Sequence, residues 1–213
     1  MLTSNVFLAI LPFALAAAVS PVLFTFALLV SGQKDKSFLK SMLFLLGSAI
    51  MIVIIGFVIF FVLAKVSPSN TFTSKDAWID ILIGSLLVLF ALKQFFTKKQ
   101  KKAKKPKNLS LVAAFVLGLG LMLGNSSTII MFFPAAHVAS FYSTSIKIQL
   151  LAIMVIFSLI PALAPPVMLR VIRSQSVIDS IKVFINTNGR YIIAGVFGVL
   201  GVIEIIKALR FWY

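Results

Sequence analysis

The chain of 213 residues has no cysteine, a single histidine and only five acidic residues. Without cysteine it can form neither a disulfide nor a thiol redox relay, and it cannot build a thiolate metal site. A site for a hard cation needs converging carboxylates, and hydrolytic chemistry needs a nucleophile beside a base. Because such side chains are so few, we expect neither an enzyme nor a protein that holds a metal or another cofactor.

What the chain has instead is apolar sequence. Hydrophobic residues make up 61% of it and its mean hydropathy is +1.11, which excludes a soluble domain. Six apolar stretches are long enough to cross a bilayer, because roughly 20 apolar residues span its hydrocarbon core. These stretches are residues 6–31, 41–64, 77–96, 109–137, 148–172 and 191–209. The sequence therefore predicts an all-α polytopic membrane protein with six transmembrane helices in a single membrane domain, residues 1–213.

The charge of the loops predicts the orientation of the chain. Its net charge is +15, and fifteen of the 20 Lys and Arg residues fall on the connections around 32–40, 93–107 and 170–190. These connections share one side of the membrane if the six spans alternate. Because basic loops stay in the cytoplasm, we expect a protein of the cytoplasmic membrane with both termini outside.

The most basic connection is the predicted cytoplasmic loop of residues 98–108. Directly beside a membrane span, its charge is typical of a topology anchor that also attracts anionic lipid head groups, and not of a nucleic-acid surface. The lysines expected to attract head groups are Lys98, Lys99, Lys101, Lys102, Lys104 and Lys105.

The two halves of the chain, residues 1–97 and 109–213, align as a weak internal repeat. Placing Ser20 and Pro21 over Asn125 and Ser126 brings the later spans of the halves into correspondence. Each half holds three spans, an odd number, so the halves must run in opposite directions through the membrane. The sequence therefore predicts two inverted three-helix repeats, a common plan among transporters.

Polar or helix-breaking residues interrupt the first and fourth spans near mid-membrane, at matching places in the halves. Broken helices free backbone groups that can line a cavity, so this pair of positions is the predicted substrate-binding site. The alternative is that the hydroxyl groups bond back to their own helix or to a neighbouring span. The residues of the predicted site are Ser20, Pro21, Thr25, Asn125, Ser126, Ser127 and Thr128.

Prolines predict further interruptions in the second half. The fifth span holds Pro161, Pro165 and Pro166, three prolines within six residues, and Pro134 lies in the fourth span. Because proline removes a hydrogen-bond donor and clashes with the preceding turn, we expect no unbroken helix across 161–166. The bend there is interpreted as a hinge for alternating access, with a fixed kink as the alternative.

Ionisable residues within membrane spans are functional candidates by default. Asp80 lies one turn into the third span and Glu204 near the end of the sixth. Lys207 follows Glu204 by three residues, a spacing that favours a local ion pair. Asp80 and Glu204 are thus candidates for gating or proton coupling, with a structural role as the alternative, whereas His137 is expected to be an ordinary interfacial residue.

The six-span layout, the Ser20–Pro21 break, the polar segment that begins at Asn125 and the lysine-rich loop together resemble the LysE superfamily of exporters. Within it, the chain is similar to the branch of peptidoglycolipid- and sulfolipid-addressing proteins, also called GAP family proteins. That branch commonly shows an Asn-Pro-Lys type segment where this chain has Ser126 and Ser127 after Asn125. The architecture also resembles the membrane domain of thiol-disulfide electron transporters, but Val22 stands where those proteins carry a cysteine.

The resemblance implies transport of an amphipathic envelope lipid or glycolipid across the cytoplasmic membrane, through a neutral polar seam at the breaks of spans 1 and 4. Its expected partners are membrane lipids, with an anionic lipid or glycolipid as substrate. Export of a small solute such as an amino acid is the alternative, and a non-transporting scaffold for envelope-lipid synthesis is a third. Gly195, Gly198 and Gly201 mark a packing face in the last span, through which a homodimer could form.

Overall fold

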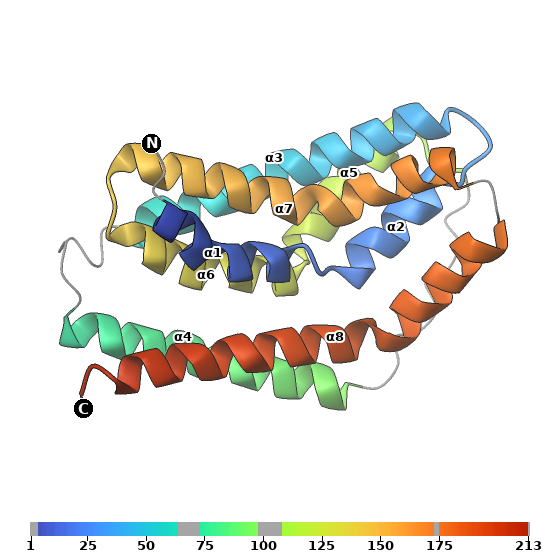
Figure 1. Ribbon diagram of the computed structural model, residues 1–213. Helices are drawn as coiled ribbons and strands as arrows, with labels where there is room; N and C mark the ends of the chain where they lie inside the picture. Colours follow the sequence, from blue (N-terminus) through green and yellow to red (C-terminus); the bar gives the residue numbers. More distant parts are fainter. Residues whose placement is uncertain (1–3, 64–72, 98–107, 173–174, 213) are drawn as a thin grey trace.

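The computed structural model describes residues 4–63, 73–97, 108–172 and 175–212, which form eight α-helices and no strand (Figure 1). The helices are α1 (Ser4–Ala17), α2 (Pro21–Ser31), α3 (Ser37–Leu63), α4 (Ser74–Phe96), α5 (Leu111–Leu123), α6 (Ser126–Ser140), α7 (Thr144–Val171) and α8 (Gln175–Leu209). The prediction of an all-α membrane protein is confirmed.

Four helices are long and apolar enough to cross a membrane unaided, namely α3, α4, α7 and the part of α8 at Thr187–Leu209. Two further spans are broken. Helices α1 and α2 meet at an angle of 59°, and α5 and α6 meet at 55°. Counting each bent pair as one span gives the six predicted spans.

Local side chains and glycines set several helix ends. The Ser110 hydroxyl accepts a hydrogen bond from the N–H of Ala113 at 3.1 Å, which caps the start of α5. At the start of α4, the carboxylate of Asp76 accepts hydrogen bonds from the backbone N–H and the hydroxyl of Thr73, at 2.7 and 2.6 Å. Gly32 and Gly124 end α2 and α5.

Helices α4 and α8 form a closely packed pair along one face of the molecule (Figure 1). A Cβ atom on Gly84 would lie 2.7 Å from the carbonyl oxygen of Gly201, and the reverse distance is also 2.7 Å, so the two backbones touch. Of the predicted glycine face, Gly201 and Gly198 thus pack on α4, whereas a Cβ atom on Gly195 would meet nothing within 4 Å. We call α4 and α8 together the α4–α8 pair.

The other six helices pack against one another as a second body, which we call the main bundle. Its closest crossing joins α3 and α5, where a Cβ atom on Gly47 or on Gly118 would run into the other helix's backbone. The α4–α8 pair meets the main bundle through α6, α1 and α2. Large apolar side chains such as Phe57 and Leu82 are exposed on the outside, as lipid contact requires.

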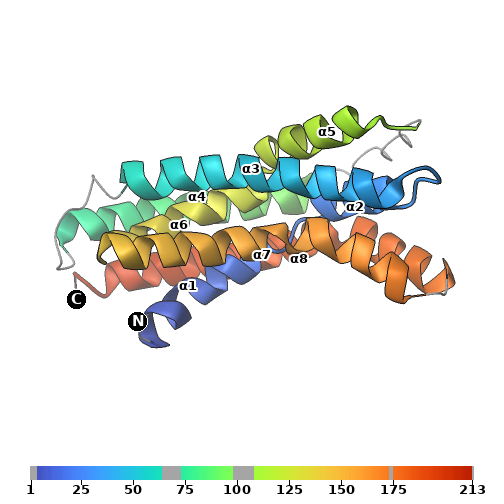
Figure 2. The same cartoon turned by 90° about the horizontal axis from the view of Figure 1, so that it is seen from above.

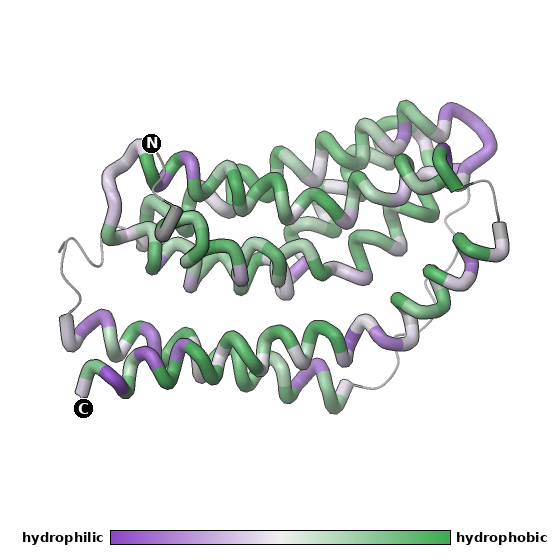
Figure 3. Tube along the Cα trace, viewed as in Figure 1, coloured by the Kyte–Doolittle hydropathy of each residue, from purple (hydrophilic) through white to green (hydrophobic). Residues whose placement is uncertain are grey.

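The first and last helices have their outer ends on the same side of the bundle. Helix α1 begins and α8 ends there, whereas α4 ends and α5 begins at the opposite end (Figures 1 and 2). This matches an even number of alternating spans. Figure 3 shows hydrophobic residues along most of each helix, and hydrophilic residues near helix ends, in the α2–α3 connection and near Thr187–Arg190 of α8.

The expected interruption of the fifth span is wrong. Helix α7 is continuous from Thr144 to Val171 and contains Pro161, Pro165 and Pro166, all buried. Its axis turns in the second half (Figure 2), so the helix bends without unwinding. Unwinding would leave several backbone groups without hydrogen-bond partners in an apolar setting. A proline within a helix removes fewer backbone hydrogen bonds than that, so the bent helix is favoured. Helix α6 likewise continues through Pro134.

Candidate functional site

The first broken span stops and restarts around Ser20. Helix α1 ends at Ala17, and α2 begins at Pro21, where the missing proline N–H costs nothing because first-turn donors have no helical partner. Ser20 is buried, and its Oγ accepts a hydrogen bond from the N–H of Leu23 at 3.4 Å. The residue caps α2, and the predicted break at this place is confirmed.

The second broken span carries linked side-chain hydrogen bonds at its break. The hydroxyl of Ser127 donates to Oδ1 of Asn125 at 2.8 Å, and Nδ2 of Asn125 donates to Oγ1 of Thr128 at 2.8 Å. All three side chains are buried, Thr128 completely. Ser126, predicted as part of the site, is exposed.

Thr128 joins the two breaks. Its hydroxyl donates a hydrogen bond to the backbone carbonyl oxygen of Ala17 at 3.1 Å. Ala17 is the last residue of α1, and the final carbonyl groups of a helix have no partner within it. The start of α6 therefore satisfies the end of α1, which is 111 residues earlier in the chain. The sequence predicted that these breaks lie together, and they do.

We call Ser20, Asn125, Ser127 and Thr128 the polar seam. It offers hydroxyl and amide groups and no ionisable side chain, so it can hydrogen-bond to a neutral or polar group without fixing a charge. Much of its hydrogen-bonding capacity is used within the protein. This agrees with the alternative prediction, in which the hydroxyl groups bond to their own helix or to a neighbouring span. Thr25 is half-buried one turn into α2.

Ionisable side chains of α4 and α6 meet away from the polar seam. Nε2 of His137 in α6 lies 3.1 Å from Oδ1 of Asp80 in α4, and both side chains are buried. Glu204 of α8 is also buried and pairs with Lys207, whose Nζ lies 3.0 Å from Oε2. The predicted Glu204–Lys207 pair is confirmed, but the role expected for His137 missed its contact with Asp80.

A cavity of 230 Å³ opens where α2, α3 and α7 meet. Its lining includes the hydroxyl groups of Ser31 and Ser41, which are 2.8 Å apart, and the guanidinium group of Arg170. That guanidinium lies over the ring of Phe38, 4.2 Å from its centre. We call this cavity the Arg170 pocket. The sequence alone does not predict this pocket, because its residues come from separate helices and none stands out alone.

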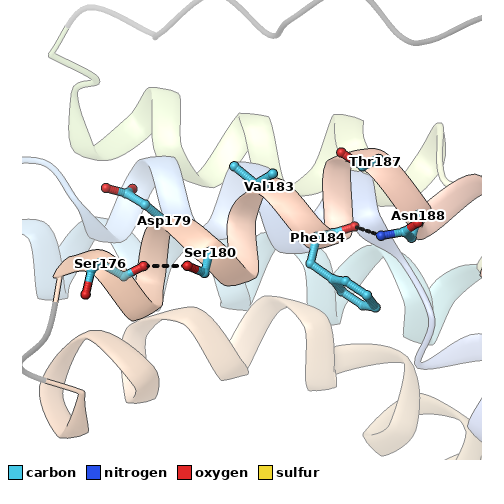
Figure 4. A pocket seen from close by; sticks show the side chains of 7 residues that line it. All are labelled: Ser176, Asp179, Ser180, Val183, Phe184, Thr187 and Asn188. Carbon is cyan, nitrogen blue, oxygen red and sulfur yellow. Dashed lines mark hydrogen bonds between the residues drawn. The ribbon is translucent and has the colours of Figure 1, made fainter.

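A larger and shallower groove, of 660 Å³, lies on the first half of α8 (Figure 4). Its lining comes from one helix face: Ser176, Asp179, Ser180, Val183, Phe184, Thr187 and Asn188. The polar groups are partly used locally, since Ser180 donates to the carbonyl of Ser176 and Asn188 to that of Phe184. The opposite face of this half packs on the main bundle, with Ile178 buried against Phe24 and Leu28 of α2.

A family model described as Sap, sulfolipid-1-addressing protein, matches residues 10–210, nearly the whole chain. The chain belongs to the sulfolipid-1-addressing protein family. This confirms the sulfolipid-addressing branch of the resemblance seen in the sequence. No curated protein and no solved structure matches the chain.

The family match covers both breaks, the buried ionisable residues and the Arg170 pocket. The predicted hinge residues Pro161, Pro165 and Pro166 lie in α7, close to that pocket, since Pro166 forms part of its lining. Pro134 is buried in α6. The six lysines predicted to attract head groups lie outside the described residues. Within the described part of this family member, no group of three or more His, Asp or Glu side chains could hold a metal ion.

Proposed function

We propose that this protein moves an amphipathic envelope lipid with an anionic head group across the cytoplasmic membrane. The family's description names a sulfolipid, and the head group of such a lipid bears an acidic sulfur group. The proposed act is translocation, with no bond made or broken. The two halves would be inverted repeats that rock around a central path, with both termini outside.

The observation that carries the proposal is the hydrogen bond from Thr128 to the carbonyl oxygen of Ala17, which joins two broken spans inside the bundle. Two interrupted spans that meet are rare in helical membrane proteins unless they line a path, because free backbone groups are costly in lipid. A head group can replace the internal hydrogen bonds of the polar seam one for one while its tails stay in lipid.

The Arg170 pocket supports an anionic head group in particular. Its lining includes Arg170, whose guanidinium group is a donor that proteins use for phosphate and sulfate groups. The hydroxyl groups of Ser31 and Ser41 beside it bond to Ala27, Ser37 and each other, and would have to turn to donate to a head group. The pocket lies at the start of α3, whose first backbone N–H groups also favour an anion. By the predicted topology this end is cytoplasmic, where the head group would bind before it moves to the polar seam.

The proposal is tested by comparing cells that lack the gene with the same cells complemented by the wild-type gene. Extractable surface lipids, total lipids and metabolites in the medium are measured by mass spectrometry. We expect one anionic lipid to disappear from the surface and to accumulate inside. Unchanged lipids with a small metabolite retained in the cytoplasm would instead assign the protein to solute export.

A third outcome separates transport from scaffolding. Purified protein in vesicles would be assayed for transfer of a fluorescent anionic lipid analogue between leaflets. If the deletion strain loses the surface lipid but purified protein moves no analogue, whereas addition of a membrane extract restores the movement, the protein acts as a scaffold of a larger complex. That result would contradict transport by this chain alone.

A further inference from the structure

A buried ionisable pair, Asp80 and His137, lies at one end of the bundle, with the buried Glu204 of α8 near the same end, and the polar seam does not need these groups. Asp80, His137 and Glu204 are 2%, 6% and 3% exposed and come from α4, α6 and α8. Charged groups inside a membrane protein are costly, so their presence calls for a compensating arrangement and marks a functional site by default.

The contact between His137 and Asp80 requires a hydrogen on one of the two groups. An imidazole nitrogen without hydrogen and a carboxylate oxygen both present lone pairs, and these repel each other at 3.1 Å. The hydrogen can belong to the imidazole or to the carboxyl group, and an imidazolium beside a carboxylate adds an ionic attraction. The two atoms lie within ion-pair distance without the alignment of a good hydrogen bond.

Protonation of His137 changes how the charge of Asp80 is compensated. Beside a neutral imidazole the carboxylate has no counter-ion in this contact, whereas beside an imidazolium it is half of an ion pair. Glu204 is paired separately with Lys207, whose side chain is 49% exposed. Because a buried charge is less costly when it is paired, the contact has a place for one proton.

Other titratable groups near this end lie outside the Asp80–His137 contact. Asp76, one turn before Asp80, accepts two hydrogen bonds from Thr73, and Lys75 and Arg210 are exposed. Helix α7 brings Lys147, which is half-buried, and Tyr142 precedes that helix. Helix α1 has no ionisable residue, and in α3 the single one is Lys40, whose Nζ donates to the side-chain oxygen of Gln33 at the opposite end. His137 is therefore the group through which a proton would pair the buried charge of Asp80.

We propose that His137, paired with Asp80, is a proton-binding site that couples the proton gradient to export. The inference rests on the proposed function, since it names the energy source for that transport. A proton enters from the side of the chain termini, binds the imidazole of His137 and is released when the site opens toward the other side. A metal ion is a poorer occupant, because the described residues hold no group of three metal-binding side chains here.

The location explains how one proton could change the conformation. The Asp80–His137 contact joins the α4–α8 pair to the main bundle at one end. At the other junction, Gly189 of α8 packs on Pro21, and Ile178 is buried against Phe24. The imidazolium strengthens the first junction by turning it into an ion pair. Loss of the proton weakens it and lets the α4–α8 pair rock on the second junction.

The first experiment uses the fact that His137 is the only histidine in the chain. The full chain, labelled with [15N]histidine and carrying a purification tag without histidine, is placed in nanodiscs and followed by NMR. We expect both neutral imidazole and imidazolium signals, with the imidazolium form gaining as the pH is lowered. A single form at every pH, neutral or charged, would overturn the proposal, and this measurement needs no variant.

A matched pair of variants shows whether Asp80 sets that equilibrium. Asp80→Asn removes the charge and keeps the shape, and we expect the ratio of imidazolium to imidazole at fixed pH to fall by about tenfold, because an adjacent opposite charge favours the charged form. Asp35→Asn, in the exposed α2–α3 connection, is the control and should leave the ratio unchanged. An unchanged ratio in Asp80→Asn would contradict the proposal.

The second experiment separates this inference from the proposed function. Surface export of the lipid found in the deletion strain is measured at several external pH values with wild type, His137→Gln and Asp35→Asn. We expect His137→Gln, at wild-type abundance in the membrane, to lose the dependence of export on pH. A deletion strain with normal lipids would refute the proposed function, whereas a His137→Gln variant with the wild-type pH profile would refute only the proton site.

Discussion

The ring of Pro21 packs directly on the backbone of Gly189. A Cβ atom on Gly189 would lie 2.5 Å from Cγ and 2.9 Å from Cβ of Pro21. The break of the first span thus touches α8 just inside its membrane-spanning part, Thr187–Leu209. This contact is one of the few places where the α4–α8 pair meets the main bundle, so its fit matters for both stability and motion.

Gly189→Ala should therefore destabilise the fold. The added methyl group meets a rigid proline ring, and overpacking of this kind costs about 1–3 kcal/mol. Thermal unfolding in detergent measures the effect. Gly195→Ala is the matched control on the same helix, because its Cβ atom would meet nothing within 4 Å and alanine favours the helix. Equal melting temperatures for the two variants would contradict the contact.

Thr128→Val should weaken the link between the two broken spans. Valine keeps the shape and loses the hydroxyl group, so the carbonyl of Ala17 and the amide of Asn125 both lose a partner. We expect a loss of about 1–3 kcal/mol in the free energy of unfolding, the cost of leaving buried polar groups without partners.

The control for that variant is Thr128→Ser, which retains the hydroxyl group and should restore most of the stability. Unfolding in detergent and surface lipid are measured for both variants. If Thr128→Val matches wild type in both measurements, the hydrogen bond contributes neither to the stability of the fold nor to the proposed transport.

Local signals explain what the sequence predicted well. The six spans follow from the length of apolar runs, and the breaks follow from Pro21 and from the polar segment that begins at Asn125, because these residues act on their own helix. The meeting of the two breaks followed from the internal repeat. The continuity of α7 was missed because the cost of its prolines depends on the surroundings, where unwinding is worse than bending.

The pairing of His137 with Asp80 could not be predicted from the sequence, because it depends on which helices are neighbours. The two residues are far apart in the chain, and although Asp80 was a candidate for gating or proton coupling, His137 on its own resembles an ordinary residue near a span end. The Arg170 pocket was missed for the same reason, since Arg170 comes from α7 and its serine neighbours from α2 and α3. Both features depend on contacts between helices, which sequence patterns do not reveal.

Arg170→Gln should weaken the binding of anionic lipid. The guanidinium is the charged donor in the lining of the pocket, so its loss should lower the affinity of purified protein for phosphatidylglycerol by about fivefold or more, as measured by native mass spectrometry. Arg210→Gln, an exposed arginine at the opposite end, should change that affinity little. Equal effects of the two substitutions would show that general surface charge, and not the pocket, attracts the lipid.

Pro165→Ala tests whether the bend of α7 is a hinge or a fixed kink. Alanine restores a backbone donor, and its higher helix propensity stabilises the fold by up to about 3 kcal/mol. The loss of buried side-chain volume offsets about 1 kcal/mol of this gain. We therefore expect a higher melting temperature. If the bend must flex during transport, the straighter and stiffer helix should lower surface export of the lipid several-fold at equal protein abundance. Raised stability with unchanged export would instead identify a fixed kink, whose role is to fit α7 against α2 and the lining of the Arg170 pocket.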